Sequence, residues 1–165
     1  MTVTIYYLQM LSPDALIPQA CPTDDVDLRE CVVKNYRYNR FLYQLVGEPW
    51  RWQDKLAESD QHWQAYAESD NLRTWVLYQT GSPIGYFELL KSASNDEVQI
   101  AYFGLAPGFY GKGLGGYLLT EAITAAWQWQ ASLVWVHTCT LDHPAALANY
   151  QRRGMTLYRQ EEENC

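Results

Sequence analysis

The chain has 165 residues, of which 48% are hydrophobic and 19% are charged, and this is enough for one domain with a sizeable core. Its formal net charge of −7 argues against nucleic-acid binding, which needs a basic face, and no apolar run approaches the roughly 20 residues that span a bilayer. The four cysteines form no C-x-x-C pair and no metal-ligand spacing. We therefore expect a single domain over residues 1–165, located in the cytoplasm, with no metal and no nucleic-acid or membrane partner.

The first half of the chain predicts one strand and two helices. Residues 2–10 alternate weakly between apolar and polar side chains, as a half-buried strand does. Three prolines then interrupt the chain before Asp24 and Asp25, either of which is suited to cap a helix. The expected elements are a strand over residues 2–10, an irregular connection over 12–24, a helix over 26–46 and a helix over 52–69.

The second half predicts more strands than helices. Turn residues at 81–83 and 92–96 divide three apolar segments into a meander. Beyond a glycine-rich loop, apolar residues recur at three- and four-residue spacing from Leu114 to Trp129, which is typical of a helix. The expected elements are strands over 73–79, 84–91 and 97–105, the helix after the loop, a strand over 133–140, a helix over 144–153 and a strand over 155–160, followed by an acidic solvated tail over 161–163.

The glycine-rich loop, residues 106–116, is the most informative feature of the chain. It lies between a strand-like and a helix-like segment and contains Gly111, Gly113, Gly115 and Gly116. Glycines let backbone N–H groups approach a ligand closely, and the helix that follows directs the positive end of its dipole at the same place. The loop therefore predicts a binding site for a polyphosphate.

Two common phosphate motifs fit this loop poorly. A Walker A loop needs a hydroxyl residue after its lysine, but Gly113 follows Lys112. A dinucleotide fingerprint is formally present at Gly111, Gly113 and Gly116, yet no acidic residue follows about 20 residues later, where the ribose contact belongs. A nucleotide-dependent oxidoreductase is thus a minor alternative, which titration with NAD would test.

Two motifs resemble those of the GNAT superfamily of acyl-CoA-dependent N-acyltransferases. Residues 110–115 are similar to motif A, [QR]-x-x-G-x-[GA], with Tyr110 in the place of the Gln or Arg. Residues 143–155 are similar to motif B, N-x-x-A-x-x-L-Y-x-x-x-G-F. Motif B matches at Ala146, Tyr150 and Gly154 and departs from the pattern at His143, Asn149 and Met155.

The resemblance covers roughly residues 98–157 and implies a fold, a co-substrate and a set of contacts. The fold is a mixed α/β (α+β) GNAT fold, in which a mostly antiparallel twisted sheet of six to seven strands is flanked by about four helices. The co-substrate is acetyl-CoA, with a small amine as acceptor; a homodimer stays open. The residues expected to bind the coenzyme are Phe103, Leu105, Tyr110, Gly111, Lys112, Gly113, Leu114, Gly115, Gly116 and Asn149.

Acyl transfer to an amine needs a base, because an aliphatic ammonium with a pKa near 10 has no free lone pair at neutral pH. Glu88 is the first candidate, since period-two alternation places it among Ile84, Tyr86 and Leu90, and apolar neighbours raise the pKa of a carboxylate. A solvated Glu is the alternative. His137 is the competing base, unless it is a core histidine or holds a water that relays the proton.

The departing thiolate needs a proton donor, and the charge that develops on the carbonyl oxygen needs hydrogen-bond donors. Tyr150 stands where motif B of the family places its proton donor, although it is also suited to be a core tyrosine. Backbone N–H groups late in the strand 97–105 are candidates for stabilising the oxygen.

The sequence leaves the acceptor open. Aromatic residues gather in and around the first two expected helices, where cations or rings can stack on them. We expect an N-acetyltransferase that acts on a primary amine of a small molecule or peptide by direct transfer. The alternative is a non-catalytic acyl-CoA-binding or sensor protein with the same fold. The aromatic residues are Tyr36, Tyr38, Phe41, Tyr43, Trp50, Trp52, Trp63 and Tyr66.

Overall fold

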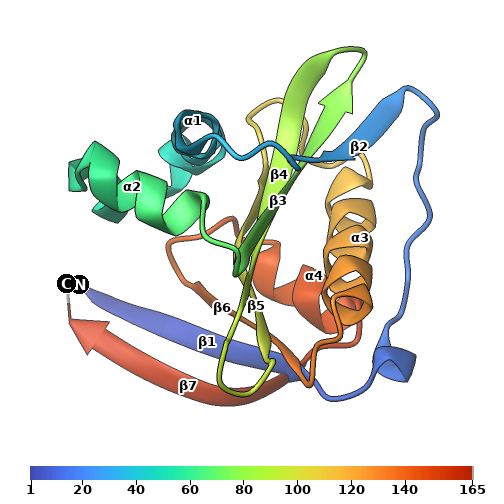
Figure 1. Ribbon diagram of the computed structural model, residues 1–165. Helices are drawn as coiled ribbons and strands as arrows, with labels where there is room; N and C mark the ends of the chain where they lie inside the picture. Colours follow the sequence, from blue (N-terminus) through green and yellow to red (C-terminus); the bar gives the residue numbers. More distant parts are fainter. Residues whose placement is uncertain (165) are drawn as a thin grey trace.

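Seven strands form one sheet in the computed structural model, which describes residues 1–164 (Figure 1). Their order is β2-β3-β4-β5-β6-β1-β7, and every neighbouring pair is antiparallel except β5 with β6. The expected mostly antiparallel sheet is therefore confirmed. The strands are β1 (Thr2–Met10), β2 (Val26–Glu30), β3 (Leu72–Gln79), β4 (Ser82–Lys91), β5 (Val98–Leu105), β6 (Val134–Cys139) and β7 (Thr156–Asn164).

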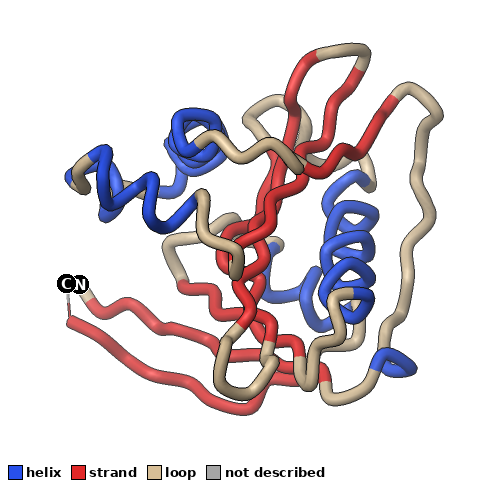
Figure 2. The backbone as a smooth tube through the Cα atoms, in the orientation of Figure 1, coloured by secondary structure: helices blue, strands red, loops and turns tan. Residues whose placement is uncertain are grey.

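Four α-helices within residues 1–164 cover the sheet on both faces. Figure 2 shows strands in red between helices in blue. Helices α1 and α2 lie on one face, and α3 and α4 lie on the other. Short 3-10 turns connect some of these elements. The helices are α1 (Tyr36–Gly47), α2 (Asp60–Ala67), α3 (Leu114–Gln128) and α4 (Ala146–Arg152), and the 3-10 turns are η1 (Pro13–Ala15), η2 (Glu48–Trp50) and η3 (Asp54–Ala57).

The core has a layer on each face of the sheet. Under α3, the apolar residues that recur along the helix, such as Leu118 and Ile123, pack against Phe87 and Ile100 of the central strands. Under α1 and α2, aromatic side chains including the fully buried Trp63 form the second layer. Strand β4 is buried on both sides, which explains its nearly continuous apolar sequence.

Two expectations for the first half of the chain are wrong. Residues 26–30 form the edge strand β2, paired with β3, where a helix over 26–46 was expected. Helix α1 begins at Tyr36, and the side chain of Asn35, in place of Asp24 or Asp25, caps it by accepting a hydrogen bond from the Arg37 backbone. Pairing with a neighbouring strand thus outweighs the helical spacing of Leu28 and its neighbours.

Two further boundaries differ from those expected. Helix α2 starts at Asp60, because the Ser59 side chain accepts a hydrogen bond from the His62 backbone, and residues 54–57 form a 3-10 turn instead of its first turn. Residues 161–163 are not a tail; they continue β7, although every residue of that strand is exposed. The pairing partner that holds them is β1.

Strand β1 lies between β6 and β7 in the sheet, so the first strand pairs with the last two. Ile5 is opposite Cys139 of β6 on one side and Glu161 of β7 on the other. Thr2 is opposite Asn164, so the start of β1 and the end of β7 lie side by side (Figure 1). The segment from β1 to β2 then runs along the outside of α3, where the Gln19 backbone N–H donates to Oγ1 of Thr120 at 2.9 Å.

The parallel pair β5–β6 separates almost as soon as it forms. Only Val98 with Val134 and Gln99 with Trp135 are paired, and the rest of β5 has no partner on that side. No helix in the described part of the chain is long and apolar enough to cross a membrane. Cys21, Cys31 and Cys139 are free thiols, and Cys165 lies outside the described residues.

Gly154 of motif B is required by close packing as well as by its backbone conformation. Its φ is +99°, and a Cβ there would lie 2.0 Å from the carbonyl oxygen of Ala15. Gly81 has a similar φ of +94° with nothing within 4 Å. We expect Gly81→Ala to cost about 1–2 kcal/mol of unfolding free energy through backbone strain alone, and Gly154→Ala to cost clearly more. Urea denaturation of both variants measures this difference, and equal losses would contradict the packing role.

Candidate active site

A cavity of about 970 Å³ opens where β5 and β6 separate. Strand β5 forms one side of it and β6 the other, while the connection between α1 and α2, the glycine loop and α4 complete its lining. Its size suits a small molecule or coenzyme. The sheet thus creates the cavity by leaving a pair of strands unpaired.

The β5 wall presents backbone groups as well as side chains. In a strand, every second N–H and C=O points away from a given neighbour, and beyond Gln99 the side of β5 opposite β4 faces no strand. Buried backbone groups of this kind need a partner, which is water or a ligand. Phe103 and Leu105, two of the expected coenzyme contacts, line this wall.

The glycine loop adopts the geometry that the sequence predicts. Gly111 and Gly113 have φ values of +74° and +78°, and Gly113 stands at the N-cap of α3 with no side-chain cap. The first N–H groups of α3 therefore have no side-chain acceptor at the helix end. Asn149 of α4 joins them, because its Nδ2 donates to the Gly115 carbonyl at 3.1 Å.

Most of the expected coenzyme contacts line this one cavity, and two do not. Leu114 is buried in the core under α3. Lys112 is exposed, with its Nζ 5.7 Å from the centre of the Phe109 ring. The expected contacts that line the cavity are Phe103, Leu105, Tyr110, Gly111, Gly113, Gly115, Gly116 and Asn149.

Arg153 and Gln19 also line the cavity beside the glycines, and the sequence analysis missed both. Gln19 donates from Nε2 to the Gly113 carbonyl at 2.8 Å and accepts at Oε1 from Nη1 of Arg153 at 2.5 Å. Arg153 is only 8% exposed, and within residues 1–164 it has no carboxylate partner. A buried cation next to the N-terminus of α3 increases the attraction of this end for an anion.

Tyr150 lies at the junction of α4 and β5. Its ring centre is 6.1 Å from that of Phe103, and its side chain lines the cavity while being only 6% exposed. Burial raises the pKa of its hydroxyl above the ordinary value of 10, so the group keeps its proton at neutral pH. No other described residue hydrogen-bonds to this hydroxyl, which leaves it available to a ligand.

Glu88 does not itself line the cavity but lies behind a residue that does. It is 1% exposed, accepting from Nδ2 of Asn39 at Oε2 and from the Tyr66 hydroxyl at Oε1, each at 2.8 Å. Tyr66, in contrast, lines the cavity. The Tyr66 hydroxyl therefore links Glu88 to the lining of the cavity by a hydrogen bond.

Three apolar residues were expected on the same face of β4 as Glu88, and two of them lie there. Tyr86 and Leu90 lie on the side of α1 and α2, as expected. Ile84 packs in the other core layer, because a bulge between β3 and β4 shifts the alternation there. Burial raises the pKa of Glu88 above its ordinary 4.5, while the Asn39 hydrogen bond, the Lys55 charge and the Tyr66 hydrogen bond oppose the rise.

His137 is exposed on β6 and faces the same cavity from the opposite wall. Its ring lies 5.7 Å from that of Tyr7 and 6.2 Å from that of Trp135, measured between centres. It is therefore not a core histidine. The two candidate bases, Glu88 and His137, belong to different walls of the cavity.

Asp142 is another residue that the sequence analysis missed. Its Oδ2 accepts from the Thr138 hydroxyl at 2.6 Å and from the Cys139 backbone at 3.0 Å, and its Oδ1 accepts from Nε1 of Trp52 at 3.2 Å. These bonds connect the end of β6 to the segment between α1 and α2. Asp142 thereby fixes one wall of the cavity against another.

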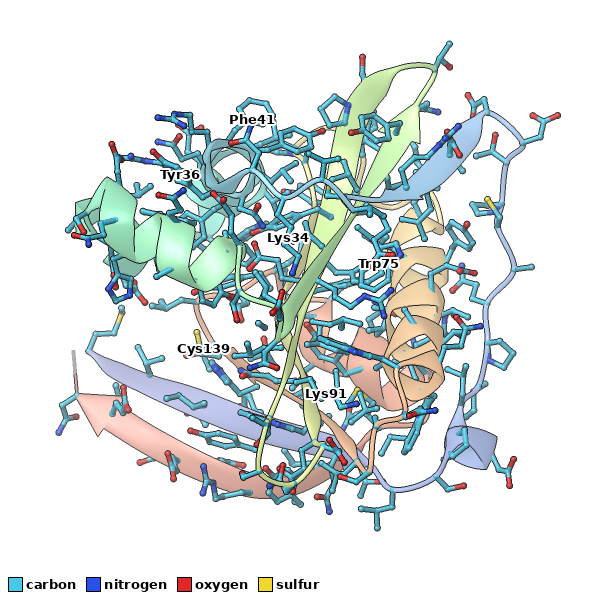
Figure 3. The ribbon with its side chains drawn as sticks, in the orientation of Figure 1. Lys34, Tyr36, Phe41, Trp75, Lys91 and Cys139 are labelled. Carbon is cyan, nitrogen blue, oxygen red and sulfur yellow. The ribbon has the colours of Figure 1, made fainter. Side chains whose placement is uncertain are left out.

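The aromatic residues expected around the acceptor divide between cavity, core and outer surface. Trp63 is buried in the core, and Phe41 lies on the outer side of α1, away from Cys139 and the sheet (Figure 3). Phe41 stacks there on Tyr38 at 6.2 Å between ring centres. The members of the set that line the cavity are Tyr43, Trp50, Trp52 and Tyr66.

The lining of the cavity carries charges of both signs. Four carboxylates line it, together with Arg51, Lys55, Arg152 and Arg153. Lys55 lies with its Nζ 3.2 Å from the centre of the Tyr66 ring. No group of three or more metal-ligating side chains occurs in the described part of the chain. The carboxylates are Asp54, Glu58, Asp142 and Glu163.

Comparison with known families gives one match, to the acetyltransferase (GNAT) family, over residues 39–155, which is more than half of the chain. None of the curated proteins matches. Many solved structures share the fold.

Among these, a GCN5-related N-acetyltransferase from Sphaerobacter thermophilus has a TM-score of 0.66 and 16% identity over 96% of this chain and 50% of that chain. One from Kribbella flavida has a TM-score of 0.67 and 16% identity over 93% of this chain and 54% of that chain. This chain thus spans about half the length of these structures.

An aminoglycoside acetyltransferase, meta-AAC0020 from an uncultured soil metagenomic sample, is also similar. In its complex with sisomicin it has a TM-score of 0.58 and 13% identity over 75% of this chain and 82% of that chain. At identities this low, the structural similarity shows a shared fold alone.

The burial of Glu88 predicts how stability depends on pH. Because its pKa is raised in the folded chain, the protonated form is favoured by folding, and its contribution to stability is lost as the pH rises above about 4.5 through the folded-state pKa. Glu88→Gln cannot titrate. We expect its free energy of unfolding to rise relative to wild type as the pH increases over that range, measured by urea denaturation at a series of pH values. A difference that stays constant with pH would show that Glu88 ionises as freely when folded as when unfolded.

Proposed function

Because the chain belongs to the acetyltransferase (GNAT) family, we propose that it transfers an acetyl group from acetyl-CoA directly to the primary amine of a small cationic acceptor. One observation carries this proposal. The uncapped N-terminus of α3, the unpaired edge of β5 and the free hydroxyl of Tyr150 all border one cavity. Acyl transfer from a phosphate-bearing thioester needs an anion site for the phosphates, hydrogen-bond donors for the charge on the carbonyl oxygen and a proton donor for the thiolate. The helix end, the strand edge and the hydroxyl supply these in that order.

The coenzyme phosphates belong at the glycine loop. The N–H groups of Gly113, Gly115 and Gly116 and the positive end of α3 favour an anion there. Tyr110 takes the family's Gln or Arg position, and the buried guanidinium of Arg153 compensates for the missing cation from a different element. The unpaired edge of β5 offers hydrogen bonds to the rest of the coenzyme arm and to the oxygen on which charge develops.

Proton transfer involves both sides of the cavity. The acceptor ammonium loses a proton before its nitrogen attacks, and Tyr66 with Glu88 behind it, or His137 across the cavity, is placed to receive that proton. Tyr150 then donates to the departing thiolate. Because burial raises its pKa above the ordinary 10, Tyr150 carries this proton at neutral pH.

Individual groups of the lining suit a cationic acceptor, although its carboxylates are matched in number by arginine and lysine side chains. The carboxylates of Asp54, Glu58 and Asp142 line the cavity, and aromatic faces that can stack on a cation lie among them. An aminoglycoside, which carries several amines, is a substrate class that fits this lining. The similarity to an aminoglycoside acetyltransferase, at 13% identity, is one of fold alone.

A thiol-release screen tests the proposed function. Purified protein is incubated with acetyl-CoA and a panel of amines, including polyamines, amino acids, aminoglycosides and peptides. Release of CoA thiol with at least one cationic amine is the expected result. Binding of acetyl-CoA with no acylation of any amine would contradict it and favour a non-catalytic acyl-CoA-binding protein.

The proposed phosphate-binding site at the glycine loop is best tested at Gly115. A Cβ there would lie 3.8 Å from both Asn149 and Leu105, which is ordinary contact, so substitution leaves the fold intact. Gly115→Asp places a carboxylate in the first turn of α3, which stabilises a helix by about 0.3–1 kcal/mol. We expect the variant to be as stable as wild type or more so, yet to bind acetyl-CoA at least ~10-fold more weakly through repulsion of the phosphates.

Gly115→Asn is the matched control, because it has the same size without the charge. Calorimetry with acetyl-CoA and with S-acetylpantetheine, which has no phosphate, separates the two effects. The extra loss in the Asp variant should vanish with acetylpantetheine. Equal losses in both variants would mean that no anion binds at this helix end.

Tyr150→Phe tests the proton donor. It keeps the ring and its contact with Phe103 but removes the hydroxyl, so acetyl-CoA affinity should change little while kcat falls by roughly 10²-fold or more. An activated thioester with a more acidic thiol should reduce the defect, because that thiolate needs less protonation. Unchanged turnover on acetyl-CoA itself would exclude Tyr150 as the donor.

A further inference from the structure

Lys55 occupies an unusual position for a lysine. Its Nζ lies among three aromatic rings, 3.2 Å from the centre of Tyr66, 4.6 Å from Trp63 and 4.9 Å from Tyr102. Tyr66, Tyr102 and Lys55 itself all line the cavity of the candidate active site. An amine of the chain therefore lies inside the cavity into which the acceptor amine has to enter.

The other three lysines have different surroundings. Lys34 donates to the backbone carbonyls of Ser69 and Leu72, and Lys91 donates to the Trp129 carbonyl at 2.8 Å. Lys112 is exposed on the glycine loop. Lys55 alone of the four lysines lines the cavity, and its Nζ has no hydrogen-bond or ion-pair partner anywhere in residues 1–164.

These surroundings favour an amine that can react. An ammonium with aromatic faces but no hydrogen-bond acceptors has lost much of its hydration, and burial lowers the pKa of Lys55 below its ordinary 10.5, although the negative charge of Glu88 partly opposes this. A larger share of Lys55 is therefore the neutral, nucleophilic form. Its backbone belongs to η3, a short turn between two helices.

We propose that Lys55 is an internal acyl acceptor, so that the protein acetylates its own Lys55 when acetyl-CoA is bound and no free amine is present. The inference rests on the proposed function, because it uses the same co-substrate and the same cavity. The Lys55 ammonium first gives up one proton, and its nitrogen then forms a bond to the acetyl carbon. The C–S bond breaks, the nitrogen loses its second proton, and the departing thiolate takes up one proton, so that acetyl-lysine, CoA thiol and one net proton are formed.

Acetylation of Lys55 changes the acceptor end of the cavity. The cation that the rings of Tyr66 and Tyr102 surround becomes a neutral amide, and the cation–π attraction is lost. A cationic acceptor then meets one positive charge fewer among the carboxylates of Asp54 and Glu58. Self-acetylation thus adjusts the affinity of the cavity for its acceptor.

The test measures acetylation at each lysine. The full chain is incubated with isotope-labelled acetyl-CoA and no free amine, and peptide mass spectrometry follows Lys34, Lys55, Lys91 and Lys112 separately. Lys55 should be labelled at least ~10-fold faster than the others, at a rate constant independent of protein concentration. Desulfo-CoA, which lacks the thiol, should block this labelling but leave any slow labelling elsewhere unchanged. Labelling that follows exposure and ignores desulfo-CoA would overturn the proposal.

Two variants complete the test. Lys55→Arg keeps the positive charge but cannot become neutral, so it should abolish the fast label, whereas Lys91→Arg should keep it. Thiol release with free amines is measured on the same preparations. If free amines are acetylated while Lys55 stays unlabelled, self-acetylation is wrong and the proposed function stands. If acetyl-CoA binds and neither reaction occurs, both self-acetylation and the proposed function are wrong.

Discussion

The structure depends on the early separation of two parallel strands. After two residue pairs, β5 and β6 diverge, and the backbone groups along the rest of β5 lose the partners that a sheet normally provides. Unpaired backbone groups are costly inside a protein, so this edge either stays hydrated or binds something. The other parts of the site are arranged around that requirement. The glycine loop follows directly from the end of β5, α4 places Tyr150 beside it, and α1 with the connection to α2 completes the lining.

The carboxylate of Glu88 shows how such a site is held rigid. It is buried between α1, α2 and the sheet, and its two oxygens accept from Asn39 and Tyr66, while Asn39 also donates to Thr74. Satisfied networks of this kind fix one arrangement, because every alternative leaves a polar group unpaired at low dielectric. The network thereby holds Tyr66, whose ring Lys55 contacts, in one position on the cavity wall.

The sequence is a good guide wherever the signal is local. The glycine loop, the helix after it, the meander and the position of Tyr150 follow from residues close together in the chain, and the structure has the loop and these elements where they were expected. The strand at 26–30 is misread because its pairing with β3 involves residues about 50 positions away. The contact of Arg153 with Gln19 and that of Trp52 with Asp142 could not be foreseen for the same reason, since each joins segments that only the complete fold brings together.

The place of β1 also determines the order in which the chain can fold. Strand β1 ends at Met10, yet both of its neighbours, β6 and β7, come only from Val134 onward in the sequence. During synthesis β1 therefore remains without a partner until β6 has been made, whereas the meander of β3, β4 and β5 can form from local contacts. Closing a loop of this length costs entropy before any contact repays it, so docking of β1 is a late and slow step. Until then two long strand edges are open to other chains, which makes this stage of folding the one most exposed to aggregation.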